Sequence, residues 1–453
     1  MRAFFVIAAL AIGFCGVAHA DDDLDRIPPA GDAPAMQTAP AAPPETGRIY
    51  TGAVVSASGV RTNGIIAAAA PASWQARIFG DVRQEKRIGS DLKLVFSDRL
   101  NLRQSSQLDV GKRGSLGNDL REASASWEAA PGVFLDAGRI NLKSGVALGY
   151  NPTDFFRPRS GIELDTADPS ARRENRLGMV MLSAQKLWNG GALLLAYAPR
   201  LAREDRLSGS LPAPADPLLG RTNGMGRFLA KASVRLAEDV APEFLVFHDR
   251  LGTKFGANLA VAVGQSMIAY GEFSGGVRGN LIEEAWAFAQ RTGTVPGFVP
   301  SPLATGGRRF RSEAVLGLSY ALENRTTLNL EYHFNEAGLS PGDWRRWFGS
   351  GAPASLLWLY RGYAGDQQQL TSRHAIFVRA ERPDVMVRGL TATGFVNVNP
   401  QDGSVMAQLG GNYALSNAWT LAGNVSAWGG GRRSEYGSLR QAAAMSVSVT
   451  RDW

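Results

Sequence analysis

Basic side chains stand at alternate positions in several short segments of this 453-residue sequence. An arginine presents a planar fork of N–H donors that can bind a carboxylate, a phosphate or sugar hydroxyls through paired hydrogen bonds. The basic positions are Arg77, Arg83, Lys93, Arg99, Arg103, Lys231, Arg235, Arg309, Arg311, Arg325, Arg373 and Arg379. The acidic positions that share these faces are Asp81, Asp91, Glu122, Glu128, Glu313, Glu331 and Glu381. The set is basic on balance, which predicts either an anion-binding surface or a wall held together by its own ion pairs.

Groups suited to catalysis or metal binding are scarce. Beyond residue 20 the histidines are His248, His333 and His374. His333 alternates with Glu331, which could orient its imidazole, but the run His333-Phe334-Asn335 contains no serine nucleophile. The single cysteine is Cys15, and no two histidines stand at metal-ligand spacing. We therefore expect no enzyme, no metal and no cofactor.

Two-residue alternation is the pattern that must position these side chains. Between Arg325 and Asn335, apolar residues at even positions alternate with polar residues at odd positions, and segments 90–103, 309–322 and 440–453 repeat this. A helix would mix the two sets. Segments of about ten residues with this alternation are typical of membrane β-barrels, in which apolar side chains face lipid and polar ones face a wet interior. The basic residues, together with Glu331 and His333, are therefore expected to line the lumen.

About eighteen segments have this alternation, and 16–18 strands are plausible. Bacterial barrels of a single chain have an even number of strands, which eighteen satisfies. The predicted strands lie near 48–58, 74–84, 90–103, 118–128, 132–142, 178–188, 192–199, 226–236, 242–250, 254–264, 267–274, 309–322, 325–335, 371–381, 384–397, 403–413, 417–428 and 440–453. Tight turns alternate with long loops at about 143–177, 200–225, 275–307 and 336–370. The sequence predicts an all-β fold, a transmembrane antiparallel barrel of the bacterial outer membrane.

The N-terminal region divides into two segments. Arg2, an apolar run and Ala18-His19-Ala20 have the layout of a secretory signal, so we expect residues 1–20 to be cleaved. Residues 21–46 are rich in proline and alanine and are expected to form a flexible lead-in, with the barrel covering 47–453. The formal net charge of +7 is spread along the chain, which argues against nucleic acid as a partner.

Two loop segments and the C-terminus carry local signals. Asn151, Pro152, Thr153 and Asp154 form a turn motif at the start of a long loop, a candidate constriction of the lumen. Segment 336–370 is too aromatic for a solvated loop and is expected to pack within its own barrel, with lipopolysaccharide phosphates or a partner as the alternatives. The final strand ends on Trp453, which resembles the C-terminal signal by which outer-membrane barrels are recognised for assembly.

Residues 48–453 resemble the porin-like outer-membrane barrels in their alternating strands, their sorted loops and Trp453. An 18-strand barrel with arginines in its lumen is also similar to the exopolysaccharide-export type, such as alginate exporters. The basic balance of the predicted lumen favours a channel for an anionic or polyhydroxylated solute, and the resemblance leaves export of an acidic polysaccharide open. The alternatives are a non-conducting surface barrel that binds a partner through its loops, and a lipid hydrolase. Outer-membrane lipid, lipopolysaccharide and the barrel-assembly machinery are the expected partners.

Overall fold

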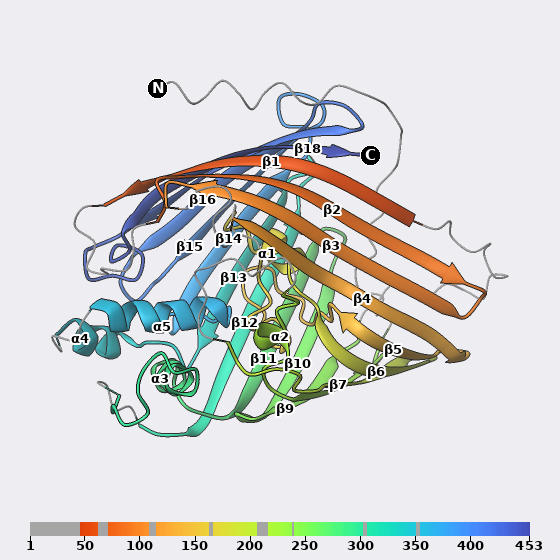
Figure 1. Ribbon diagram of the computed structural model, residues 1–453, viewed down its shortest axis with the longest axis horizontal. Coiled ribbons are helices and arrows are strands. Elements are labelled where there is room, and N and C mark those ends of the chain that lie inside the picture. Colours follow the sequence, from red (N-terminus) through yellow and green to blue (C-terminus); the bar gives the residue numbers. More distant parts are fainter. Residues whose placement is uncertain are drawn as a thin grey trace.

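Eighteen antiparallel strands form one closed sheet in the computed structural model (Figure 1). The structure describes residues 46–61, 71–107, 115–162, 166–205, 216–237, 240–301, 306–349 and 354–453. The strands are β1 (Thr46–Val60), β2 (Trp74–Ile88), β3 (Leu92–Ser105), β4 (Leu116–Ala130), β5 (Val133–Ile140), β6 (Met179–Trp188), β7 (Gly191–Ala198), β8 (Arg227–Val234), β9 (Glu243–Asp249), β10 (Gly252–Val263), β11 (Met267–Arg278), β12 (Arg309–Ala321), β13 (Thr327–Asn335), β14 (His374–Arg382), β15 (Leu390–Val398), β16 (Val405–Ala414), β17 (Trp419–Gly429) and β18 (Gln441–Asp452). The predicted fold class is confirmed. The predicted signal and residues 21–45 of the predicted lead-in lie outside the described residues.

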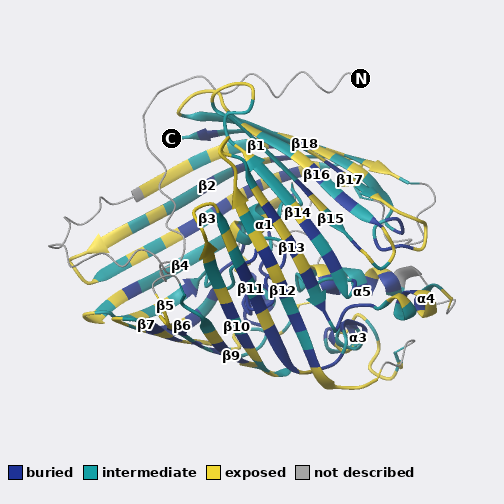
Figure 2. Ribbon diagram, turned by 180° about the vertical axis from the view of Figure 1, so that it is seen from behind, coloured by how far each residue is buried: buried dark blue, intermediate teal, exposed yellow. Residues whose placement is uncertain are grey.

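Exposed and less exposed residues alternate along the strands (Figure 2), as the two-residue pattern of apolar and polar side chains predicts. On β12 and β13, Leu316 and Leu330 are 67% and 49% exposed on the outer face, whereas Glu331 and His333 are fully buried on the inner face. An exposed apolar band costs free energy in water, but it matches the hydrocarbon of a bilayer. The outer surface therefore fits lipid, and the polar chemistry of the molecule lies inside.

The barrel closes where β1 pairs with β18, and this pairing is the seam of the sheet. The register runs from Tyr50 opposite Asp452 to Val60 opposite Gln441. At one end of the seam, the backbone N–H of Trp453 donates to the carbonyl of Ile49 at 2.9 Å. Because β1 also pairs with β2, neither β1 nor β18 has an unpaired edge.

Within the ranges that the structure describes, five short helices lie in the connections. They are α1 (Pro169–Glu174), α2 (Leu219–Thr222), α3 (Leu281–Arg291), α4 (Pro341–Gly349) and α5 (Ala354–Asp366). No helix in the described part of the chain is long and apolar enough to cross a bilayer. Figure 1 shows α3, α4 and α5 grouped at one end of the barrel, which we call the long-loop end.

The helices at the long-loop end share a small apolar core. Trp344 and Trp347 of α4 pack in it with Tyr360 and Tyr363 of α5 and Phe288 of α3. The segment singled out for its aromatic content thus buries those residues against neighbouring loops of the same chain. That the segment packs within the barrel itself stays a prediction.

The connection between β5 and β6 runs inside the barrel. We call residues 141–162 the inner loop. Its Phe155 and Phe156 pack against Met181, Leu229 and Phe247, which are inward-facing residues of β6, β8 and β9. Ring stacking fixes this contact, with 4.7 Å between the centroids of Phe155 and Phe247. The inner loop therefore fills the lumen along this part of the wall.

Candidate functional site

Glu272 of β11 holds the inner loop against the wall. Its Oε1 accepts hydrogen bonds from the backbone N–H groups of Val146 and Ala147 at 2.6 and 2.7 Å, and from Asn151 Nδ2 at 3.2 Å. Its Oε2 accepts from the hydroxyl of Thr153 at 2.9 Å and from its backbone N–H at 3.3 Å. A buried carboxylate is stable only when such donors replace its water. Asn151 and Thr153 of the predicted turn motif thus lie buried inside the barrel.

Glu331 of β13 forms a second anchor, at loop residues that lie between those bound by Glu272. Its two oxygens accept the backbone N–H groups of Leu148 and Gly149 at 2.6 and 2.9 Å. The Tyr270 hydroxyl donates to Oε1 at 2.7 Å, and His333 Nε2 lies 2.6 Å from Oε2. His333 is fully buried in this contact. Glu331 and His333, both predicted to line the lumen, face inward, and together they support the inner loop.

The rest of the turn motif is fixed by ion pairs and aromatic contacts. Asp154 Oδ2 pairs with Arg176 Nη1 at 2.6 Å, and both side chains are almost fully buried. The hydroxyl of Tyr150 donates to Glu313 Oε2 at 2.6 Å. Burial, reinforced by the Glu313 charge, raises the pKa of Tyr150 well above its usual range, so the hydroxyl remains a donor at neutral pH. Whether Asn151–Asp154 constrict a passage stays a prediction.

We expect Gly317→Ala to destabilise the second anchor. A Cβ at Gly317 of β12 would lie 2.8 Å from the hydroxyl oxygen of Tyr270 and closer still to its ring. The ring must move away from Glu331, and such overpacking costs about 1–3 kcal/mol. The midpoint of urea unfolding, followed by tryptophan fluorescence, should fall. Gly80→Ala is the matched control because nothing lies within 4 Å of that position; equal midpoints for the two variants would contradict the prediction.

A row of cationic side chains follows the inner faces of β2, β3 and β4. Arg77 stands opposite Arg103 in the sheet near the long-loop end, and Arg99 stands opposite Asp81. Arg99 Nε donates to Asp81 Oδ2 at 2.7 Å, and Arg121 also pairs with this carboxylate. We call Arg77, Arg83, Lys93, Arg99, Arg103 and Arg121 the cationic row. It extends through most of the length of β2 and β3.

Carboxylates interleave with the cationic row toward the other end of the barrel. Arg83 pairs with Glu85 and Glu122 at 2.7 Å each. Lys93 also pairs with Glu85, at 2.5 Å. These side chains keep contact with solvent, since Arg83 is 42% and Lys93 20% exposed. The acids thus hold the basic groups in place, and the basic groups remain reachable from the lumen.

The remaining predicted lining residues fall in different places. Lys231 pairs with Glu243 at 3.2 Å, Arg311 is buried beside the carbonyl of Gly307, and Arg379 pairs with Glu381 at 2.5 Å. Arg373 stands immediately before β14. Three predicted residues lie at the ends of strands: Arg235 in the loop after β8, Arg309 exposed and paired with Glu336, and Arg325 in a turn with φ of 63°. For Arg235 and Arg325 the predicted strand was longer than the one formed, so neither contributes to the inner wall.

The second half of the β5–β6 connection crosses the lumen. Gln408 Oε1 on β16 accepts the backbone N–H of Ala167 at 2.9 Å. A few residues later, Asn175 Oδ1 accepts from Arg99 Nη2 on β3 at 3.0 Å. The chain that includes α1 therefore contacts both β16 and the cationic row. These contacts have no signature in the sequence, because this connection has no periodicity that would indicate its direction.

The inner wall is divided into a filled side and a polar side that solvent reaches. Inward-facing residues such as Met181, Leu229, Phe247 and Glu272 are buried beneath the inner loop, although Lys254 and Ala260 of β10 keep partial exposure. On β15, β17 and β18, by contrast, Thr393, Asn424, Ser448 and Thr450 remain partly exposed. Small hydroxyl and amide side chains keep such a wall hydrated. These strands continue through β1 into the strands of the cationic row, so the partly exposed part of the inner wall is contiguous.

Acid is expected to loosen the long-loop end. Glu204 pairs with Arg250 at 2.8 Å and with Arg291 of α3 at 3.2 Å. Burial opposes ionisation of Glu204, but hydrogen bonds from these arginines outweigh it and lower its pKa. The stabilisation is therefore complete above the ordinary value of about 4.3 and is lost as pH falls through the lowered pKa.

Hydrogen exchange of α3, corrected for intrinsic rates, measures this loss. Protection of residues 281–291 should decrease below about pH 4, and Glu204→Gln should reduce protection already at neutral pH. Asp384→Asn is the control, because Asp384 pairs with Arg325 in a turn between strands at the opposite end. Protection that does not depend on pH in the unaltered protein would contradict the role of Glu204.

Comparisons with known proteins show that the fold of this chain is similar to that of solved porin structures. No family model and no curated protein matches the chain. Pseudomonas aeruginosa OccK11 (OpdR) is 12% identical with a TM-score of 0.50, covering 90% of this chain and 95% of that one. Pseudomonas aeruginosa OccK5 (OpdH) is 9% identical with a TM-score of 0.50, covering 90% and 97%. A mutant porin of Rhodopseudomonas blastica is 10% identical with a TM-score of 0.38, covering 90% and 100%.

Proposed function

Because the chain folds as a closed 18-strand barrel of the porin-like type, we propose that it is a channel of the bacterial outer membrane for small anionic or polyhydroxylated solutes. The observation that carries this proposal is the cationic row, which adjoins the hydrated polar wall of β15, β17 and β18 around the barrel through β1. Fixed positive charge in a narrow passage lowers the barrier for anions and raises it for cations. Arginine forks also suit carboxylates, phosphates and sugar hydroxyls.

The inner loop favours a small solute over a polymer. It occupies the lumen along β6–β13, and the α1 segment contacts both β16 and β3. A polysaccharide would need a continuous wide passage, whereas a small solute needs only the space beside the cationic row. Export of an acidic polysaccharide is therefore not the function that we propose.

Catalysis is not part of the proposal. A lipid hydrolase needs an accessible histidine next to a nucleophile. His333 is fully buried, and its Nε2 is engaged by Glu331 at 2.6 Å. A histidine in this position supports the wall and cannot reach a lipid substrate.

The expected partners follow from the proposed location. The exposed apolar outer face would contact outer-membrane lipid, and the long-loop end would meet lipopolysaccharide. We propose that β18 and Trp453 are read by the barrel-assembly machinery. Trp453 is 55% exposed and lies over the Arg451 guanidinium, with 3.8 Å from its ring centroid to the guanidinium carbon. Its ring is thus both held in place and accessible.

Single-channel recording of the purified, refolded protein in a potassium chloride gradient tests the function. Stable conductance steps with a reversal potential shifted toward the equilibrium potential of chloride would support an anion-preferring channel. A cation preference would overturn the basic-lumen argument while leaving a channel. A folded barrel without conductance would instead favour a surface barrel that binds a partner through its long loops.

A further inference from the structure

A cavity of about 60 Å³ lies at the long-loop end, between the inner loop, α3, α5 and the ends of β8–β11. One ordered water needs about 10–15 Å³ of such space, so the cavity can hold a small polyatomic group. Its lining includes Arg157, Arg227, Lys254, Gln367 and Gln369. Phe155, Phe247 and Tyr363 supply apolar walls, which strengthen any electrostatic contact inside.

Arg157 of the inner loop is the unexplained group in this cavity. It is 5% exposed, and its guanidinium carbon stands 4.5 Å from the ring centroid of Tyr150. Within the described residues, its guanidinium donates no hydrogen bond to an oxygen. Arginine has five N–H donors and is charged at any physiological pH, so these donors need water or an anion in the cavity as their acceptor.

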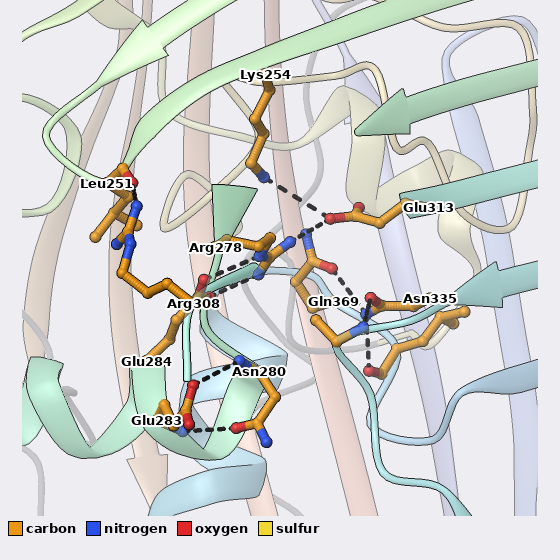
Figure 3. Close-up of polar contacts among 12 residues, drawn as sticks. Leu251, Lys254, Arg278, Asn280, Glu283, Glu284, Arg308, Glu313, Asn335 and Gln369 are labelled. Carbon is orange, nitrogen blue, oxygen red and sulfur yellow. Dashed lines mark hydrogen bonds and ion pairs between the residues drawn. The ribbon is translucent and has the colours of Figure 1, made fainter. Parts of the chain in front are cut away.

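Glu313 is the carboxylate on which the charge of Arg157 acts, and it already has other partners. Glu313 accepts the Tyr150 hydroxyl at 2.6 Å, pairs with Arg278 and lies 3.7 Å from Lys254 Nζ. Figure 3 shows Lys254 and Arg278 directed at Glu313, with Glu284 on the far side of Arg278. Arg278 also pairs with Glu284 at 2.6 Å, so none of these acids is left to neutralise Arg157.

A second buried arginine in the cavity also has no carboxylate partner. Arg227 of β8 is 4% exposed, and its Nη1 contacts only Met179 Sδ at 3.1 Å and the carbonyl of Thr222 at 3.4 Å. Asp249 stands opposite Arg227 in the sheet, but its Oδ1 accepts the backbone N–H of Leu251 and it forms no ion pair in the described structure.

The other acids that line the cavity have cationic partners. Asp154 pairs with Arg176, and Glu204 pairs with Arg250 and Arg291. Two arginines with spare donors thus face one small, mostly enclosed space.

We propose that this cavity binds one oxyanion group, a carboxylate or a phosphate, between Arg157 and Arg227. A planar or tetrahedral oxyanion supplies the acceptors that the two guanidinium forks lack, and Gln367 and Gln369 can offer amide donors beside it. Binding here needs no conduction, so the proposal stands apart from the channel function. The anion would also tie the inner loop, which carries Arg157, to β8 of the wall.

Calorimetric titration of the full-length protein in detergent with sodium acetate and with sodium phosphate, at constant ionic strength in chloride, tests the site. Saturable binding of one anion per chain is expected for at least one of the two, and the comparison tells carboxylate from phosphate. Arg157→Gln should weaken it about 10–100-fold, the loss for hydrogen bonds to a charged group. Arg235→Gln removes the same charge from an exposed loop and should leave the affinity unchanged.

Equal affinity for Arg157→Gln and the unaltered protein, or no saturable binding of either anion, would overturn the proposal. The heat-dependent electrophoretic mobility of folded barrels checks that each variant is folded. If Arg157→Gln does not fold, Arg157→Lys replaces it; lysine keeps the charge without the fork, so intermediate affinity is expected, and unchanged affinity would also overturn the site. A barrel that binds anions but gives no conductance would reject the channel and retain the site.

Discussion

Replacing Glu272 and Glu331 together by glutamine is expected to release the inner loop and raise the single-channel conductance. The two carboxylates accept seven hydrogen bonds from residues 146–153 of that loop. Hydrogen bonds to a charged group contribute about 1.5–3 kcal/mol each. A glutamine has only one acceptor oxygen, and its NH₂ group would face backbone N–H groups. We expect larger and noisier conductance steps, and faster proteolysis of residues 141–162.

Glu381→Gln is the matched control for this pair. Glu381 also lies on the inner wall, but it is engaged by Arg379 and Thr393 of the strands and does not contact the inner loop. Its conductance should therefore stay close to that of the unaltered protein. If the double variant conducts like Glu381→Gln, the wall carboxylates do not position the inner loop.

Charge reversal in the cationic row is expected to change the ion preference. The variant Arg83→Glu/Lys93→Glu puts two negative charges where two partly exposed positive ones stood, beside Glu85 and Glu122. In water, a unit charge at 4 Å alters the energy of an ion by about 1 kcal/mol, which is about a fivefold change in relative permeability per charge. The reversal potential in a potassium chloride gradient should shift toward the equilibrium potential of potassium.

Arg325→Glu serves as the control for the charge reversal. Arg325 lies in the β12–β13 turn and pairs with Asp384 at the rim of the barrel. Its reversal should shift the potential much less than the double variant. An unchanged preference in the double variant would mean that ions do not pass the cationic row.

The strands were predictable because a single physical cause sets them. A wall with lipid on one face and a polar lumen on the other imposes a two-residue period, and each of the eighteen predicted segments overlaps a strand. The errors fall where that cause is locally absent. The strand predicted at 267–274 in fact continues to Arg278. The prediction ended too early because Gly275 and Gly276 carry no side chain that would show the alternation.

The candidate site was less predictable than the wall. A bulge in β4 turns both Arg121 and Glu122 inward, where they meet Asp81 and Arg83. Alternation would have assigned one of the two to lipid. Residues that anchor a loop, such as Glu272, cannot be recognised from their strand alone. Their partners are backbone N–H groups of the inner loop, which have no sequence signature.

The seam between β1 and β18 makes closure of the barrel a matter of chain entropy. The side chains of Arg48 and Asp452, which meet across it at 3.0 Å, are 404 residues apart in the chain. Bringing together the ends of a segment that long costs about 5 kcal/mol of configurational freedom. Until Tyr50–Val60 of β1 has paired with β18, the edges of both strands have unsatisfied N–H and C=O groups that can pair with other chains. We therefore expect closure of the seam to be the step of folding at which a catalyst of assembly has most to gain.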